Sequence, residues 1–428
     1  MPGPRAPRRP FQGRRVVLGV TGGIAAYKAI TLARDLTLAG ASVDVVLTEG
    51  ALEFVRPLTF EALTGRPAYS SLYPQGDPLL HIRLARDAHA VVVAPATANF
   101  LARAAAGMAD DLLTATLLAT EAPVVLCPAM NDRMYAHPAT QANLARLAEF
   151  GYRLAGPAVG PLAWGEGEGP GRMLEPDEIL AHAGRALEGA TPLSGKRVVV
   201  TAGGTREAID PVRYIGNRSS GRMGYEIAAA AWRRGADVLL ISGPSPLSVP
   251  PGVELRRIES AEQMLDAVRS ALAEADALVM AAAVADFRPA DAAAHKIKKE
   301  AGTVPQITLE ATADVLRATR EARRPGSVVV GFALETNDAV ENGRRKLQGK
   351  GLDLLVVNDA TEPGAGFEVD TNRVVLLQPG QPDEALPLMS KAAVADAILD
   401  RVDALVSTAS SVGSADAKVD AGAAEARG

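Results

Sequence analysis

The chain has 428 residues, 48% of them hydrophobic, and this length predicts two or three domains that each bury a core. The formal net charge of -5 gives no electrostatic reason to expect nucleic acid or an anionic membrane as a partner. With one cysteine (Cys127), five histidines that lack zinc-ligand spacing, and no apolar run near the ~20 residues that span a bilayer, the sequence predicts a cytoplasmic protein without a metal site.

The N-terminal half alternates between apolar runs and helical patterns. Residues 1–13 are basic and lack a following apolar stretch, which predicts a disordered arm. The Val-rich run Arg15–Val20 is typical of a strand covered on both faces, and a Gly-rich turn and a helix ending at Gly40 follow it. Further strands are predicted at 42–48, 90–95 and 123–128. This alternation predicts a parallel, doubly wound sheet over residues 14–187.

A Gly/Pro-rich stretch then interrupts the pattern. Residues 155–173 are predicted to form a loop, and a loop of this length in a compact domain is usually functional or mobile. A helix is expected from about residue 176 to 187. Residues 188–195 are predicted to be a linker between two domains.

The C-terminal half repeats the opening pattern, because Lys196–Thr205 again runs from an apolar strand into a Gly-rich turn. This predicts a second Rossmann-like, mostly parallel α/β domain over residues 196–404. Its further strands are expected at 236–242, 277–284, 327–334 and 352–359, with a final hairpin formed by 372–378 and 386–389. Residues 405–428 contain few large apolar side chains, which predicts a disordered tail.

The two Gly-rich turns are candidate phosphate sites. A strand–turn–helix junction such as Thr21–Ile24 directs backbone N–H groups and the positive helix end at one point. Neither turn contains G-x-G-x-x-G or the P-loop pattern, which disfavours a hydride-transferring dehydrogenase. For either turn alone, a tight turn that binds no ligand is as frequent as a phosphate site. The turns also do not discriminate between NAD, FMN, CTP and ATP.

Two blocks of motifs carry a resemblance to known enzymes. The N-terminal half contains GVTGGIAAYKA, His81-Ile82 ahead of APATANF, GMADDLLTAT and PAMNDRMY, and resembles the flavin-dependent cysteine decarboxylases. The C-terminal half contains VTAGGTREAIDPVRYIGNRSSGRMG, AAAVADFRPA, KIKK, GFALET and GFEVDTN, and resembles phosphopantothenate–cysteine ligase. From about Arg14 to Val402, the order of motifs is similar to that of the bacterial bifunctional enzymes of coenzyme A biosynthesis.

The resemblance implies two reactions. In the ligase half, CTP with Mg²⁺ activates the carboxylate of 4'-phosphopantothenate as an acyl-cytidylate, and the amine of cysteine displaces CMP. In the decarboxylase half, FMN oxidises the cysteinyl thiol carbon, which eases loss of carbon dioxide, and a proton donor then helps to form 4'-phosphopantetheine. The family also implies trimeric contacts for the first domain and dimeric contacts for the second, which would build a larger closed homo-oligomer such as a dodecamer.

The resemblance assigns roles in the N-terminal half. His81 stands where the family has its base, and histidine suits proton removal near neutral pH, although most single histidines are structural. Asn131 would hold the substrate carboxylate, and its other interpretation is a turn or helix cap. The remaining substrate positions are Met134 and Arg172. The FMN positions are Gly22, Gly23, Ile24, Thr48, Pro95, Thr97 and Asn99.

The resemblance also assigns roles in the ligase half. Asn217 would act on the acyl-cytidylate, Arg213 in the second half-reaction, and Lys296 on the triphosphate. A lysine run is usually a solvated surface, but a lysine beside a nucleotide compensates its charge. Ala283 matches a substrate position. The other CTP positions are Met280, Ala281, Ala282, Asp286, Ala313 (where the usual residue is Pro), Asp314, Val315, Leu316, Phe332, Lys346 and Lys350.

One position departs from the family. Trp164 stands where the family has the cysteine that protonates the ene-thiol intermediate, and an indole N–H is no acid at neutral pH. Glu166 or Glu168 could replace that donor, water could protonate slowly, or the reaction could stop before protonation. The alternatives to a bifunctional enzyme are a ligase whose N-terminal half is impaired, and a flavin-binding regulatory module without turnover.

Overall fold

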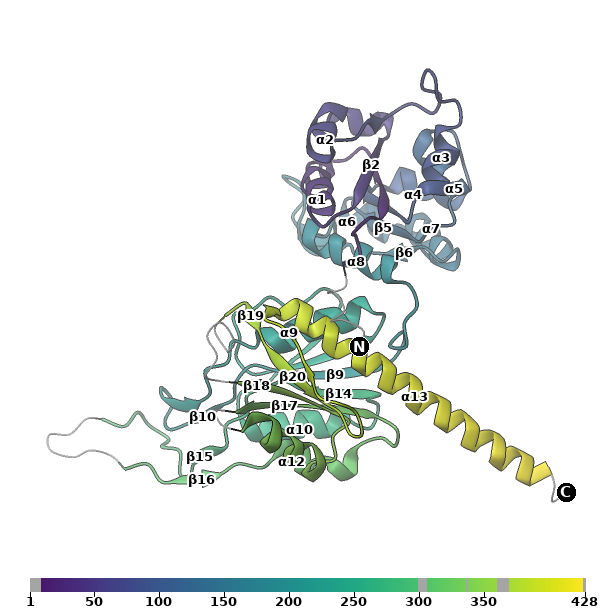
Figure 1. Ribbon diagram of the computed structural model, residues 1–428. Coiled ribbons are helices and arrows are strands. Elements are labelled where there is room, and N and C mark those ends of the chain that lie inside the picture. The colour runs from purple at the N-terminus through teal and green to yellow at the C-terminus, as the bar shows by residue number, and fades with distance from the viewer. Residues whose placement is uncertain (1–8, 299–305, 336–337, 360–368, 426–428) are drawn as a thin grey trace. The chain divides into compact units, whose positions relative to one another are not determined.

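The computed structural model describes residues 9–298, 306–335, 338–359 and 369–425. These residues belong to two compact units, Arg9–Gly189 and Ala190–Gly428 (Figure 1). Residues 1–8 of the predicted arm, the last three residues of the predicted tail, Lys299 of KIKK and the start of GFEVDTN lie outside the described residues.

The first unit is built on a six-stranded parallel sheet. In spatial order its strands are β3 (Ala68–Tyr69), β2 (Ser42–Leu47), β1 (Arg15–Val20), β4 (Ala90–Ala96), β5 (Val124–Pro128) and β6 (Arg153–Leu154). The order changes direction between β1 and β4, as in a doubly wound sheet. The predicted fold class is therefore confirmed for this half.

Helices cover both faces of this sheet because the strand side chains alternate between two cores. Leu18 and Val20 of β1 pack on the side of α1 (Ala26–Leu38), α2 (Pro57–Thr64) and α8 (Pro176–Glu188), whereas Val17 packs on the opposite side. The helices of the opposite side are α3 (Leu80–Asp87), α4 (Ala98–Ala105), α5 (Leu112–Ala119) and α7 (Pro138–Glu149). The short η1 (Glu49–Glu53) and α6 (Asp132–Ala136) follow β2 and β5.

Two segments of this unit differ from the sequence-based expectation. The predicted loop 155–173 contains an antiparallel hairpin, β7 (Ala158–Pro161) paired with β8 (Glu168–Arg172). Its glycines permit the tight turn at residues 162–167 that periodicity alone does not reveal. The arm 1–13 is also not wholly disordered, because Phe11 is buried in the core beneath α1. The side chain of Phe11 attaches the arm to the core of the first unit. The average composition of the segment does not reveal this one contact.

The second unit repeats the same topology. Its sheet has the spatial order β13 (Glu254–Arg257), β12 (Asp237–Ser242), β9 (Arg197–Ala202), β14 (Ala277–Met280), β17 (Val328–Glu335), β18 (Leu354–Asp359), β20 (Val374–Leu377) and β21 (Glu384–Ala385). The strands are parallel as far as β18, and β20 and β21 are antiparallel. This confirms the mostly parallel, doubly wound sheet, although the last hairpin uses β21 instead of residues 386–389.

Helices also cover both faces of the second sheet (Figure 1). One face carries α10 (Ala261–Ala271), α11 (Val315–Ala318) and α12 (Ala339–Gly349), and the other carries α9 (Arg222–Arg233) and α13 (Lys391–Glu425). Two small hairpins extend from the carboxyl edge. They are β10 (Arg206–Ala208) with β11 (Tyr214–Gly216), and β15 (Phe287–Pro289) with β16 (Leu309–Ala311). The remaining short elements are η2 (Arg320–Ala322), β19 (Thr371–Asn372) and β22 (Met389–Ser390).

The last helix, α13, extends beyond residue 404, the predicted limit of the second domain. Residues 405–428 were expected to be disordered, but α13 continues through them to Glu425. Val402 and Val406 are buried, so the packed part of α13 already enters the predicted tail.

Arg234, directly after α9, is a fully buried cation that anchors α13. Its guanidinium contacts Asp403 at 2.8 Å, Asp400 at 3.0 Å and Asp396 at 3.3 Å. Removing one partner from a buried ion-pair network leaves uncompensated charge, so we expect Arg234→Ala to lower the unfolding free energy by about 3–5 kcal/mol. Urea unfolding of the full chain measures this loss.

The adjacent Arg233 provides a matched control for this change. It pairs with Asp396 at 2.5 Å, but its side chain is 22% exposed. Because exposed ion pairs contribute little, Arg233→Ala should cost only about 1 kcal/mol or less. Equal losses in the two variants would show that burial of Arg234 does not determine its contribution.

Candidate functional site

A large cavity opens at the carboxyl edge of the first sheet, where the order reverses between β1 and β4. Its volume is about 1260 Å³. Open α/β sheets bind ligands at this topological switch point, because the loops from the two strands lead to opposite faces and leave a crevice. The cavity is the candidate site of the first unit.

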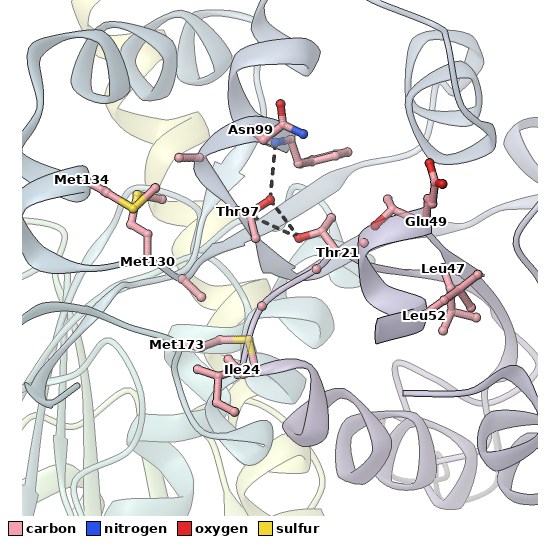
Figure 2. Close-up of a pocket in the computed structure, with 18 of the residues that line it drawn as sticks. Thr21, Ile24, Leu47, Glu49, Leu52, Thr97, Asn99, Met130, Met134 and Met173 are labelled. Carbon is pink, nitrogen blue, oxygen red and sulfur yellow. Dashed lines mark hydrogen bonds between the residues drawn. The ribbon is translucent and has the colours of Figure 1, made fainter. Parts of the chain in front are cut away.

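The floor of the cavity is the turn after β1. The Thr21 hydroxyl donates to the Pro95 carbonyl at 2.7 Å and accepts from the Thr97 amide at 3.1 Å, which joins the ends of β1 and β4. Thr97 also caps α4 by accepting from the Phe100 amide at 3.4 Å. Figure 2 shows the Thr21–Thr97 pair at the centre of the site, with Asn99 beside it.

Gly22 makes this turn possible through a close approach to the loop after β2. A Cβ on Gly22 would lie 2.5 Å from the backbone carbon of Gly50. At Gly23, a Cβ would have an ordinary contact of 3.6 Å with Thr97. The turn leads into α1, so its backbone amides and the helix N-terminus point toward the cavity edge.

The structure brings most of the predicted decarboxylase residues together. Gly22, Gly23, Ile24, Thr48, Thr97, Asn99, Asn131, Met134 and Arg172 all line the cavity. Pro95 lies below the lining, where its carbonyl supports Thr21. His81 lies on α3 and Trp164 lies in the hairpin turn, and neither is among the lining residues.

The opposite wall is formed by residues 129–131 and the β8 end of the hairpin. Asn131 caps α6 by accepting from the Arg133 amide at 2.9 Å, so the predicted capping role and a substrate role remain compatible. The Met130 amide donates to the Gly171 carbonyl at 3.0 Å. A Cβ on Gly171 would lie 2.2 Å from the Met130 carbonyl, so only glycine allows the two segments to meet. Met130 and Met134 form one side of the view in Figure 2, opposite Leu47 and Leu52.

Sequence reasoning missed an ionic contact between α1 and the end of this hairpin. The buried Lys28 donates to the Met173 carbonyl at 3.1 Å and to Glu175 at 2.9 Å, and Glu175 also accepts from Arg172. The hydrogen bond from Lys28, with help from Arg172, lowers the pKa of the Glu175 carboxyl. Lys28 was visible as the one basic residue in GGIAAYKA, but its partner lies 147 residues further along the chain.

A second ionic group lies at another part of the rim. Arg103 donates to Asp110 at 3.1 Å and to Asp111 at 2.9 Å. Asp111 also caps α5 through the Thr114 amide at 2.8 Å. The motif GMADD contains both carboxylates. The sequence did not reveal that Arg103 pairs with both of them, in one cluster that lines the cavity.

Trp164, Glu166 and Glu168 lie at or beside the turn of the β7–β8 hairpin, and their side chains have different surroundings. Trp164 is fully exposed, with a relative accessibility of 102%, whereas Glu166 lines the cavity and Glu168 does not. Cys127 is buried inside β5, and burial raises the pKa of its thiol far above the ordinary value. Of these groups, only Glu166 combines an acidic side chain with a position on the cavity wall.

The second unit brings its predicted residues to the equivalent edge. The turn after β9 pairs with the segment after β14, since the Ala283 amide donates to the Gly203 carbonyl at 2.8 Å. The side-chain amide of Asn217 donates to the carbonyls of Ala283 at 3.2 Å and Val284 at 3.1 Å. Met280 ends β14 inside the core, and Ala281 and Ala282 follow it at this edge. The predicted strand 277–284 is therefore only half strand.

The remaining predicted CTP residues lie in different surroundings in the second unit. Asp314 caps α11 through the Arg317 amide at 3.2 Å and pairs with Lys350 at 2.9 Å, which places those two together. Val315 and Leu316 have buried side chains, so only their backbone is available to a nucleotide. Asp286 and Lys296 are exposed, Phe332 lies in β17, Lys346 lies in α12, and Ala313 precedes Asp314.

Two features are absent from the part of the chain that the structure describes. No three His, Cys, Asp or Glu side chains there are grouped so that they could hold a metal ion. No helix in the same part of the chain combines the length and apolarity needed to cross a membrane.

Comparison with known proteins covers both units. Residues 4–186 match a family model described as "Flavoprotein", and residues 193–405 match "DNA/pantothenate metabolism flavoprotein C-terminal domain". The "Coenzyme A biosynthesis bifunctional protein CoaBC" of Vibrio vulnificus is 46% identical over 92% of this chain and 98% of its own length. The protein of that name from Mycolicibacterium smegmatis is 49% identical over the same shares. A crystal structure of a CoaBC C-terminal domain covers 51% of this chain and all of that domain, with 36% identity and a TM-score of 0.44.

Proposed function

The chain belongs to the family of bifunctional coenzyme A biosynthesis proteins, and from this premise we propose that it ligates cysteine to 4'-phosphopantothenate and then decarboxylates the product to 4'-phosphopantetheine. The observation that carries the proposal is that relatives match over 92% of the chain, so both units are included. A ligase with an impaired N-terminal half and a regulatory flavin module are not favoured, because the bifunctional relatives and the family models match both units.

The first cavity suits FMN. Its volume of about 1260 Å³ admits a flavin, and the Gly22–Gly23 turn at the start of α1 offers backbone amides to one terminal phosphate. Leu47 and Leu52 on one side and Met130 on the other supply apolar contacts for a flat ring. When bound, FMN would supply the oxidation of the thiol carbon that makes loss of carbon dioxide possible.

The chain's own residues would position the substrate in this cavity. The Asn131 side-chain amide can donate to the substrate carboxylate, while its Oδ1 keeps α6 capped. Arg172 lies at the end of β8 and can offer a second, cationic donor from the hairpin, beside the neutral amide of Asn131. His81 as base remains a prediction, since it lies on α3 away from the lining of this cavity.

The second unit suits a nucleotide that activates a carboxylate. Asn217 fixes the Ala283–Val284 backbone beside the β9 turn, so that the turn amides and this segment form one surface for an acyl-nucleotide. Lys296 and Lys350 supply cations for a triphosphate, and Mg²⁺ would enter with CTP. CTP in preference to ATP, homo-oligomeric assembly and a cytoplasmic location remain predictions.

Incubation of the purified chain with 4'-phosphopantothenate, cysteine, Mg²⁺ and either CTP or ATP tests the proposal. We expect phosphopantothenoylcysteine, CMP and pyrophosphate with CTP, resolved by mass spectrometry, followed by 4'-phosphopantetheine. The protein should show flavin absorbance and release FMN on denaturation. A colourless protein that cannot be reconstituted with FMN would refute the decarboxylase assignment while leaving the ligase assignment open.

A more specific prediction concerns the acid that replaces the missing cysteine. Glu166 lines the cavity in the hairpin turn, and we expect it to deliver the proton to the ene-thiol carbon. General acids contribute about 10²–10⁴-fold, so Glu166→Gln should slow formation of saturated 4'-phosphopantetheine by about 100-fold or more. The product is measured by mass after a single turnover.

Glu168→Gln is the matched control, because it removes the same charge from the same hairpin without a place in the lining. This variant should behave like the parent, and so should Trp164→Phe, since Trp164 faces solvent. Full activity in Glu166→Gln would clear Glu166 of the role. An unsaturated ene-thiol as the product of the parent enzyme would show that no donor has replaced the cysteine.

A further inference from the structure

We infer that Asp210 is a positioning residue for the ligase reaction, which acts with Arg213 as a clasp on the lysine segment, residues 293–298. The inference rests on the proposed function, because it takes Lys296 of this segment as a triphosphate contact. Asp210 stands in the loop between β10 and β11, and the lysine segment stands in the long connection between β15 and β16.

Asp210 is the centre of the clasp. Its side chain is fully buried, and the Arg213 guanidinium donates to Oδ2 from Nε at 2.9 Å and from Nη2 at 2.5 Å. Oδ1 accepts from the amides of Val212 at 2.8 Å and Arg213 at 2.9 Å. These bonds, the guanidinium first, hold the pKa of Asp210 far below its ordinary value, so the carboxylate is charged at any working pH.

The clasp holds the lysine segment by its backbone. Asp210 Oδ2 accepts from the Ile297 amide at 3.1 Å, and Arg213 Nη2 donates to the Ile297 carbonyl at 2.7 Å. The Ala293 amide also donates to the Ile209 carbonyl at 2.9 Å. One ion pair therefore satisfies both polar backbone groups of the residue that follows Lys296.

This arrangement leaves the cations free for a ligand. The clasp bonds no lysine side chain, and Lys296 and Lys298 are both exposed. The Arg213 side chain is itself 47% exposed, so part of its guanidinium faces outward from the clasp. A segment whose backbone is already ordered loses less entropy when its side chains close on a triphosphate. The expected consequence of the clasp is tighter use of CTP.

The test substitutes Asp210 with asparagine, which replaces one acceptor oxygen by an amide that faces the guanidinium and the Ile297 N–H. We expect KM for CTP to rise by about tenfold or more, with a smaller change in kcat, since charge-assisted hydrogen bonds of this kind are lost. Asp291→Asn is the matched control, because it removes the same charge from the exposed start of the same connection. It should behave like the parent.

A readout that does not depend on turnover is amide hydrogen exchange in the nucleotide-free full chain. We expect exchange of the Ile297 amide and tryptic cleavage after Lys296 and Lys298 to accelerate by about tenfold in Asp210→Asn, with the core of the second unit unchanged. Unchanged exchange at Ile297 would overturn the clasp even if ligase activity fell. Because this readout needs no catalysis, failure of the clasp and failure of the proposed function can be told apart.

Two further variants keep the test decisive. If Asp210→Asn loses its fold, Arg213→Lys carries the test, since a lysine keeps the charge but cannot reach Asp210 and the Ile297 carbonyl together. Faster exchange confined to the lysine segment in Arg213→Lys supports the clasp, and parent-like exchange overturns it.

Lys296→Gln alone should mainly raise KM for CTP. Adding Asp210→Asn to it should then cost less than in the parent, and full additivity would contradict action through Lys296.

Discussion

Replacement of Asn217 with aspartate is expected to slow the ligation of cysteine to 4'-phosphopantothenate by about 100-fold or more, the loss that follows when the backbone that positions the reacting groups is displaced. The Asn217 side-chain amide donates to the carbonyls of Ala283 and Val284. A carboxylate donates to neither carbonyl and repels both. The segment after β14 would then separate from the β9 turn, and the acyl-nucleotide surface would be lost.

The measurement is the rate of CMP release with saturating 4'-phosphopantothenate, CTP and cysteine, because CMP leaves only when the cysteine amine displaces it. The bifunctional chain provides its own control, because the first unit should still decarboxylate phosphopantothenoylcysteine that is supplied directly. A parent-like rate of CMP release in Asn217→Asp would sink the assignment of the second site. Loss of both activities would instead point to general misfolding of the variant.

The second large effect is expected from Gly22→Ala, which should weaken FMN binding by about tenfold to a hundredfold and remove decarboxylation at ordinary FMN concentrations. A Cβ on Gly22 would lie 2.6 Å from the Gly50 carbonyl oxygen and 2.8 Å from the Gly50 Cα. Backbone atoms cannot rotate away, so the turn must shift, at a cost of about 1–3 kcal/mol. The shift would misplace the amides that face the phosphate.

FMN content after gel filtration and a fluorescence titration with FMN measure this effect. Gly23→Ala is the matched control for the clash, because its Cβ would have only an ordinary contact with Thr97. Ligase activity should remain in both variants. If Gly22→Ala binds FMN as tightly as the parent, the turn is not the phosphate site.

Several parts of the site could be predicted because their signals are local. The apolar runs that end at Thr21 and Thr97 marked the carboxyl ends of two strands, and parallel winding brings such ends together. The family motifs placed Asn131 and Arg172 on the same cavity, where the structure also finds them. The disordered tail was predicted from composition over residues 405–428, where the structure has α13 as far as Glu425.

Other features could not be predicted because their partners are distant in sequence. Lys28 meets Glu175 across 147 positions, and Asp210 meets Ile297 across 87. The sequence around Lys28 or Asp210 does not indicate which distant residue it contacts. The motif around Trp164 likewise gave no sign that Trp164 faces solvent while Glu166 lines the cavity.

By itself the sequence determined two α/β units, the central strands of each sheet and the glycine turns at their carboxyl ends, since periodicity and backbone freedom are properties of neighbouring residues. Only the tertiary structure decided which charged groups hold those turns and loops in place. Lys28, Asp210 and Arg234 take their roles from long-range contacts, and such contacts exist only after both sheets are wound and their polar groups have been removed from water.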